Sequence, residues 1–321
     1  MRIISAKYKG FAVAVIGLLA FCPAVTSAAV KKDIVKEFNV ASGGLLTVET
    51  DRGSIEVVSS SDEKVTVEIS LNSRTSDQDR ADEMFEGFEV NFDQNGNDIS
   101  VTADYYGDND RGWRFWEDHS SNKLQVKFFV TVPRKYNISL NTKGGSISVG
   151  EIIGEIDVCT SGGSLSFGNI EGQVIGKTSG GSITMEDCNG RIDVRTSGGS
   201  ITLGYIKGDV IAHTSGGSIE VEEVKGAIDA STSGGSITAR IAEQPADDCR
   251  LTTSGGGVTI YLADGLNMNL NARTSSGRVN TDIPVSLRGR LKKSSIMAEI
   301  GNGGPELYLR TSGGNINISE Y

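Results

Sequence analysis

The sequence contains few of the residues from which catalytic and metal centres are built. Its 321 residues include 2 His, 4 Cys and 2 Trp, and 6% of the residues are aromatic. Neither His119 nor His213 has a Cys or a second His nearby at the spacing of a metal site. The serines, histidines and acidic residues form no nucleophile motif. We therefore expect a protein without catalytic activity, metal or cofactor.

Long apolar runs are also missing, apart from one near the N-terminus. The run from Phe11 to Phe21 follows three basic residues and precedes the small residues Ser27 and Ala28. A run of about eleven residues is too short to cross a bilayer, and this arrangement is typical of a secretory signal peptide. We predict a signal peptide at residues 1–28 and no membrane span after its removal. The mature protein is expected in the periplasm, on the cell surface or outside the cell.

Basic residues are in the minority, and cysteines are too few for a disulfide framework. Removing residues 1–28 takes away three of the 31 Lys and Arg, which leaves 28 against 41 Asp and Glu, a net charge of 28 − 41 = −13. That sign argues against binding to nucleic acid or to an anionic surface. The three cysteines that remain do not resemble the even sets found in small disulfide-stabilised domains.

Glycine, by contrast, is abundant and regularly spaced, with 41 residues in the chain. The segment from Thr178 to Ile183 has the sequence Thr-Ser-Gly-Gly-Ser-Ile. Near-copies begin at Thr142, Thr160, Thr196, Thr214, Thr232, Thr253, Thr274 and Thr311. The five steps from Thr142 to Thr232 are 18 residues each. A fixed period of this size is typical of a solenoid, in which each repeat, or rung, buries its apolar face against neighbouring rungs.

Each rung consists of two nine-residue halves. Glycines recur every nine residues from Gly190 to Gly235, and apolar residues follow two and four positions after each glycine. Apolar residues two apart are the pattern of a half-buried strand. The predicted inward side chains are Ile192, Val194, Ile201, Leu203, Val210, Ala212, Ile219, Val221, Ile228, Ala230, Ile237 and Ala239. Equivalent strands of successive rungs should then pair in parallel.

The two corners of a rung differ in the residue that lies two positions before the glycine. One corner has the aliphatic series Ile152, Ile170, Cys188, Ile206 and Val224, so Cys188 is predicted to be a buried, unreactive thiol. The other corner has serines, which we expect to fill a narrow slot: Ser161, Ser179, Ser197, Ser215 and Ser233. The Gly-Gly pair beside these serines suggests positive backbone dihedrals, because other residues adopt those at a cost.

These patterns predict an all-β fold, a parallel β-solenoid with 18-residue rungs. A left-handed hexapeptide helix would need an aliphatic residue every six positions, and from Ile183 that spacing arrives at Asn189 and Arg195. The right-handed sense usual for parallel crossovers is therefore expected. Two strands per rung are the simplest arrangement, and a third short face at one corner stays open.

We predict one continuous domain after the signal peptide. Residues 29–141 would hold a first rung near residue 40, a short helix within residues 76–88 and antiparallel capping strands, because an exposed terminal rung promotes aggregation. Residues 142–321 would form the regular solenoid, with a hairpin inserted before the last strands. Ile316 and Ile318 would end the stack.

Two segments outside the regular rungs have unusual composition. Trp113 and Trp116 lie among acidic residues, where they could bind a sugar or a cation or could fold back on the capping strands as a hairpin tip. The run with Arg288, Arg290, Lys292 and Lys293 is interpreted as a solvated hairpin.

The outward strand positions provide a further candidate site. One face carries a hydroxyl ladder that includes Ser182, Thr184, Ser200 and Thr202. Such a ladder could bind carbohydrate or order water as ice-binding proteins do, although Ser and Thr also simply suit exposed strands. The other face carries three aspartates two rungs apart, Asp157, Asp193 and Asp229. Their expected separation of roughly 9 to 10 Å is at the edge of the range of inverting glycosidases.

Several segments together resemble the bacterial DUF4097 family. They are the Gly-Ser-Ile corners, the opening segment from Phe38 to Val57, the entry Val130-Thr131-Val132-Pro133 and the terminal Thr-Ser-Gly-Gly unit. The resemblance covers nearly all of residues 35–320. It implies an exported β-solenoid of the cell envelope, in a family labelled for adhesion of which some members are associated with envelope-stress signalling. It implies no catalytic residues.

Three hypotheses for the function follow. The leading one is an exported, non-enzymatic, adhesin-like interaction module whose partner is a protein or glycan of the cell surface or envelope. The second is an envelope-stress or regulatory component of the periplasm. The third is a polysaccharide-active β-helix enzyme. Nucleic acid is not an expected partner.

Overall fold

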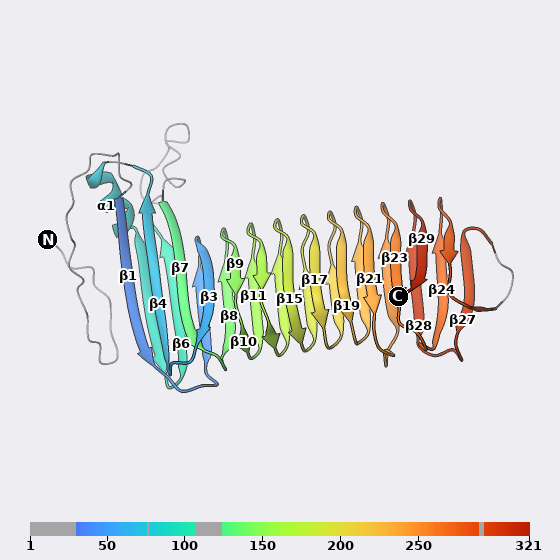
Figure 1. The fold of residues 1–321 in the computed structure, drawn as a ribbon. Coiled ribbons are helices and arrows are strands. Elements are labelled where there is room, and N and C mark those ends of the chain that lie inside the picture. The colour runs from blue at the N-terminus through green and yellow to red at the C-terminus, as the bar shows by residue number, and fades with distance from the viewer. Residues whose placement is uncertain (1–29, 76, 107–123, 289–291) are drawn as a thin grey trace. The chain divides into compact units, whose positions relative to one another are not determined.

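A computed structural model describes residues 30–321, except for residues 76, 107–123 and 289–291. The chain divides into two compact units, residues 1–145 and residues 146–321 (Figure 1). The predicted signal peptide and the predicted site at Trp113 and Trp116 lie outside the described residues.

Unit 1 contains two sheets. The first has the order β1–β4–β7–β3, with β1 Val30–Asn39, β3 Ser54–Ser60, β4 Lys64–Ser73 and β7 Leu124–Pro133. The second has the order β5–β6–β2–β8, with β2 Leu45–Thr50, β5 Phe88–Asn95, β6 Asp98–Tyr105 and β8 Asn137–Thr142. The β1–β4, β4–β7 and β5–β6 pairs are antiparallel. However, β7 pairs in parallel with β3, and β6 pairs in parallel with β2. The strands predicted as a cap thus extend the same sheets as the first rung.

The predicted first rung and helix are both confirmed. β2 and β3 bury alternate apolar side chains, namely Leu46, Val48, Ile55 and Val57. The helix α1 spans Gln78–Glu86, and its N-cap Asp77 accepts hydrogen bonds from the first-turn N–H groups of Asp79 and Arg80. The helix buries Ala81, Met84 and Phe85 on one face.

Unit 2 is a stack of parallel rungs with two long sheets (Figure 1). Sheet A runs in the order β9 Ile147–Val149, β12 Leu165–Phe167, β15 Ile183–Asn189, β17 Ile201–Ile206, β19 Ile219–Val224, β21 Ile237–Ile241, β23 Val258–Leu262, β29 Ile316–Glu320 and β25 Val279–Thr281. Sheet B runs in the order β11 Ile156–Thr160, β14 Val174–Thr178, β16 Ile192–Arg195, β18 Val210–His213, β20 Ile228–Thr232, β22 Cys249–Thr253, β28 Glu306–Thr311, β24 Met268–Thr274, β27 Ser295–Ile300 and β26 Ser286–Leu287.

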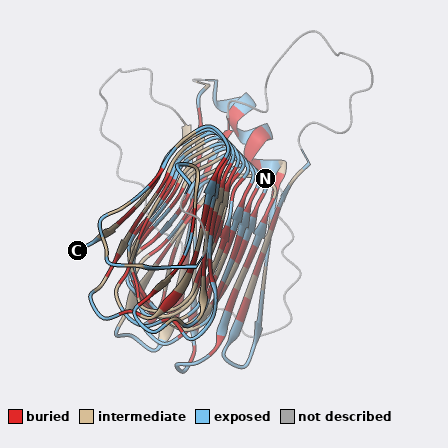
Figure 2. Cartoon of the chain, turned by 90° about the vertical axis from the view of Figure 1, so that its right-hand side faces the viewer, coloured by how far each residue is buried: buried red, intermediate tan, exposed pale blue. Residues whose placement is uncertain are grey.

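The core of unit 2 follows the predicted nine-residue pattern. The inward residues predicted between Ile192 and Ala239 are all between 0% and 2% exposed. Figure 2 shows the resulting alternation of buried and exposed positions along the strands. A short third face also exists, because β10 (Ile152–Ile153) pairs with β13 (Ile170–Glu171), and this column continues through Cys188, Ile206 and Val224.

The narrow slot at the Thr-Ser-Gly-Gly corner is filled by threonine, so the prediction for the serines is wrong. Thr178 is 6% exposed, whereas Ser179 is exposed. The alternation of β14 continues through the corner, which points Thr178 inward and Ser179 outward. The Thr178 hydroxyl donates to Gly163 O at 2.7 Å and accepts from the Gly181 N–H at 3.3 Å. Each rung is thus joined to the preceding one by a buried hydroxyl.

The Gly-Gly pairs need glycine for a different reason from the one predicted. The glycines with positive φ in the described residues are Gly43, Gly53, Gly96, Gly172, Gly265, Gly301 and Gly303, and none of these belongs to a Thr-Ser-Gly-Gly corner. A Cβ at Gly181 would instead lie 2.1 Å from Gly163 O in the rung before. Close stacking of successive corners therefore excludes a side chain at Gly181. The backbone conformation of Gly181 does not itself require glycine, because its φ is not positive.

The final strands lie within the stack, so the prediction that Ile316 and Ile318 end it is wrong. β28 lies between β22 and β24, and β29 lies between β23 and β25. The chain therefore places β24 and β25 one rung further out and returns to fill the gap. The antiparallel strands β27 and β26 follow β24 at the end of sheet B.

Candidate functional site

The predicted hydroxyl ladder lies on the outward face of sheet A. Register pairs Ser166 with Thr184, Thr184 with Thr202, and Thr202 with Glu220. Adjacent strands of a sheet are about 4.8 Å apart, so these side chains form a close row. Thr184 and Thr202 are both exposed. The structure therefore places these two predicted site residues side by side, in a row that Glu220 interrupts.

The serines of the predicted site have a structural contact. The Ser182 hydroxyl accepts the backbone N–H of Ser200 at 3.2 Å, and the Ser200 hydroxyl accepts the backbone N–H of Ser218 at 3.2 Å. Equivalent bonds join Ser164 to Ser182 and Ser218 to Ser236. Each serine oxygen thus already accepts one bond from the protein, and a hydroxyl group can in addition donate its hydrogen and accept a second bond.

The three aspartates of sheet B lie in one outward column, with isoleucines between them. Asp157 pairs with Ile175, which pairs with Asp193, and the column continues through Ile211 to Asp229. Asp193 is held by the guanidinium group of Arg195, with N–O distances of 2.8 and 3.0 Å. The aspartates are therefore two strand spacings apart, as predicted, and one of them is neutralised.

The neighbouring column of sheet B brings together two residues that the sequence analysis did not connect. Nδ1 of His213 on β18 lies 2.5 Å from Oγ of Ser231 on β20. The signal was present in the sequence, because the two residues are separated by one 18-residue period.

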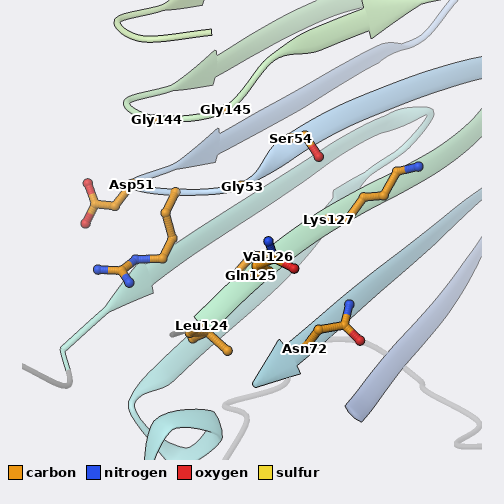
Figure 3. A pocket seen from close by; sticks show the side chains of 11 residues that line it. Asp51, Gly53, Ser54, Asn72, Leu124, Gln125, Val126, Lys127, Gly144 and Gly145 are labelled. Atoms are coloured by element: carbon orange, nitrogen blue, oxygen red, sulfur yellow. The ribbon is translucent and has the colours of Figure 1, made fainter. Parts of the chain in front are cut away.

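A hollow in unit 1 is a second feature that the sequence did not predict. It has a volume of about 690 Å³ and lies where the start of β3 meets β7 (Figure 3). Its lining includes Arg52, whose guanidinium lies 4.0 Å from the centre of the Tyr105 ring, and Lys127, which pairs with Glu56 at 2.8 Å. Asp51 at its rim binds Lys143, and this hydrogen bond and the negative charge of Asp51 raise the pKa of Lys143. Its lining comes from separated segments, and no sequence pattern joins them.

The thiols differ in exposure. Cys188 is 3% exposed, as predicted, and burial raises its pKa to about 11. Burial also raises the pKa of Cys249 to about 11, whereas Cys159 is exposed on sheet B.

Within residues 30–106, 124–288 and 292–321, with residue 76 set aside, no three His, Cys, Asp or Glu side chains are grouped to hold a metal ion. In the part of the chain that the structure describes, no helix has the length and apolarity needed to span a membrane.

A family model described as Toastrack DUF4097 matches residues 45–319. The chain belongs to this family. Solved structures similar to the Toastrack chain include a candidate adhesin of Bacteroides fragilis, with 15% identity, a TM-score of 0.39, and 90% of this chain and 97% of that chain covered. Another is a candidate cell adhesion protein of Clostridium sporogenes, with 14% identity, a TM-score of 0.22, and 92% and 100% of the two chains covered. No curated protein matches the Toastrack chain.

Proposed function

We propose that the protein is an exported, non-enzymatic interaction module with an adhesin-like role, which binds a protein or glycan of the cell surface or envelope. The observation that carries this proposal is the in-register column on sheet A, which repeats over seven rungs as Ser148, Ser166, Thr184, Thr202, Glu220, Thr238 and Thr259. The buried Ile and Leu side chains beneath it and the threonine bonds between rungs hold this face in place. A fixed face loses little conformational freedom on binding.

The residues of sheet B give less support to the alternative of a polysaccharide-active enzyme. Ile175 and Ile211 separate the aspartates, and Arg195 binds the carboxylate of Asp193. A general acid for glycoside hydrolysis must be free to reach the glycosidic oxygen, whereas both oxygens of the Asp193 carboxylate already accept hydrogen bonds from Arg195.

The test compares binding of purified chain to isolated bacterial envelopes and to whole cells. The variant Thr184→Val with Thr202→Val removes two hydroxyls and keeps the side-chain shape. Each hydrogen bond contributes about 1 kcal/mol, so the double variant should bind roughly tenfold or more weakly. The matched control is Thr47→Val with Thr102→Val, on outward positions of β2 and β6 in unit 1. Equal binding by the two double variants would contradict the placement on sheet A, and no binding by the parent would contradict the function.

A further inference from the structure

The charges of unit 2 are unevenly distributed around its rungs. Each Thr-Ser-Gly-Gly corner, or its variant, connects a strand of sheet B to a strand of sheet A. Its six-residue segment begins at the last outward residue of the sheet B strand and ends just before the sheet A strand, as residues 177–182 do between β14 and β15. In eight rungs these segments contain no Asp or Glu, and we call them together the acid-free strip: 159–164, 177–182, 195–200, 213–218, 231–236, 252–257, 310–315 and 273–278. The acidic residues of these rungs lie elsewhere, for example Glu186, Asp187, Glu222 and Glu223.

The strip holds five basic residues, Lys177, Arg195, Arg273, Arg278 and Arg310. Sheet B places one residue of each rung in a single outward column, which runs Lys177, Arg195, His213, Ser231, Thr252, Arg310 and Arg273. Six strand spacings of about 4.8 Å make this column about 29 Å long. Serines and glycines of the corners lie alongside it.

Most of these basic groups lack a carboxylate partner. Arg310 donates to the Tyr308 hydroxyl at 3.4 Å, and Arg273 contacts the Met297 sulfur at 3.6 Å. Among the described residues, only Arg195 of the five forms an ion pair, with Asp193. Arg310 and Arg273 also lie directly opposite each other on β28 and β24, and like charges in that position repel. An anion bound between them would relieve this repulsion.

We propose that the acid-free strip binds an anionic polysaccharide. This proposal rests on the proposed function, names the partner, and extends the binding surface from the outward face of sheet A to the corner segments that directly precede its strands. Guanidinium groups bind carboxylate, sulfate and phosphate with two parallel hydrogen bonds, and the serine hydroxyls can bond to sugar hydroxyls. A periodic column of donors suits a linear polymer with a regular repeat.

The composition of the strip distinguishes this partner from others. The large apolar side chains that are exposed in the described residues all lie outside the strip, whereas protein interfaces depend on buried aromatic and apolar anchors. Within the part of the chain that the structure describes, the column contains three cations without a carboxylate partner, Lys177, Arg310 and Arg273, which over about 29 Å give one unpaired charge per roughly 10 Å. Duplex DNA carries one charge per about 1.7 Å, so the strip suits a polymer of lower charge density. The chain has a net charge of −10, but most of its charges lie beyond about 8 Å from the strip and are screened at physiological salt. The nearest carboxylates on the sheet B strands are those of Asp157, Asp193 and Asp229, two positions before the strip, and Asp193 is paired with Arg195.

The test uses polygalacturonate as the probe and its fully methyl-esterified form as the uncharged polymer of the same backbone. The variants are Arg273→Ser with Arg310→Ser inside the strip and, as a charge-matched control, Arg191→Ser with Lys207→Ser outside it. Arg191 and Lys207 are both exposed. The parent and the control variant should bind polygalacturonate, with affinity falling as salt rises, and should not bind the ester. The strip variant should bind about tenfold or more weakly, the loss expected from one or two charge-assisted bonds.

The inference is overturned if the parent does not bind polygalacturonate, if it binds the ester equally well, or if both double variants lose the same affinity. Circular dichroism of the strip variant shows whether it is folded. Arg310→Lys keeps the charge, so it should bind polygalacturonate more tightly than the strip variant and more weakly than the parent. If the parent binds envelopes but not polygalacturonate, this inference fails and the proposed function stands. If it binds neither, both fail.

Discussion

Replacing Gly181, the second glycine of its corner, should destabilise the protein far more than replacing Gly180, the first. An ideal Cβ at Gly181 would lie 2.1 Å from Gly163 O and 2.4 Å from Gly163 C, whereas the nearest atom to a Cβ at Gly180, Gly162 O, is at 3.3 Å. Gly181→Ala therefore forces successive corners apart by about 1 Å, and overpacking of this kind costs about 1–3 kcal/mol. The displaced carbonyl also accepts the Thr178 hydroxyl at 2.7 Å, and losing that bond adds about 1 kcal/mol.

The expected loss for Gly181→Ala is thus about 2–4 kcal/mol, against less than about 1 kcal/mol for Gly180→Ala. Both substitutions restrict the unfolded chain to a similar degree, so their difference isolates the steric clash. Urea denaturation followed by circular dichroism measures both. Equal midpoints for the two variants, or a larger loss for Gly180→Ala, would refute the explanation from close stacking.

Other predictions concern the hydroxyl bonds and the thiols. Thr196→Val should lower the free energy of unfolding by about 2–3 kcal/mol, because Gly181 O and the Gly199 N–H lose the hydroxyl that lies 2.7 and 3.4 Å from them. Thr196→Ser keeps both bonds and serves as the control. Equal urea midpoints for the two variants would contradict this. Ser200→Ala removes an acceptor at 3.2 Å, but water can replace it, so a loss of about 1 kcal/mol or less is expected in the same assay. Folding raises the pKa of Cys188 from 9.0 to about 11, so its contribution to stability is complete below pH 9 and is lost as the pH rises toward 11. Between pH 9 and pH 11 the unfolding free energy of the parent should fall as the pH rises, and in Cys188→Ala this fall should be smaller by up to about 1.4 kcal/mol per pH unit. Urea denaturation at several pH values measures both slopes. Equal slopes would show that the thiol does not titrate in this way.

The periodic part of the fold could be predicted because every rung repeats the same burial pattern. The spacing of Ile201, Leu203 and Ile206 identifies the inward positions without any knowledge of neighbouring chain. Successive copies of that pattern also fix the parallel register, because a shift by one residue would expose the apolar set.

The predictions for the corner serines, the corner glycines and the last strands were wrong because these features depend on contacts between rungs. Whether Thr178 or Ser179 fills the corner depends on which side chain can bond to Gly163 O, an atom 15 residues away. The glycine requirement at Gly181 likewise comes from a neighbouring rung. The order of β24 and β28 in sheet B is a third case, because β28 pairs with β22 and β24, which are far from it in the sequence. The alternation of Leu307 and Leu309 predicts a strand but does not indicate which strands lie beside it.

The candidate site was predictable only in part. The outward positions of Thr184 and Thr202 follow from alternation, but the acceptor role of Ser182 and Ser200 depends on the backbone of the next rung. The acid-free strip was hidden by the whole-chain charge, because a net value carries no information about where Lys177, Arg273 and Arg310 lie.

The most direct test of the adhesin-like role is to incubate the purified chain with envelope polysaccharide and to measure both binding and polymer length. The account predicts saturable binding that is weakened by Thr184→Val with Thr202→Val, with the polymer length unchanged after prolonged incubation. Absence of binding, or progressive shortening of the polymer, would contradict it.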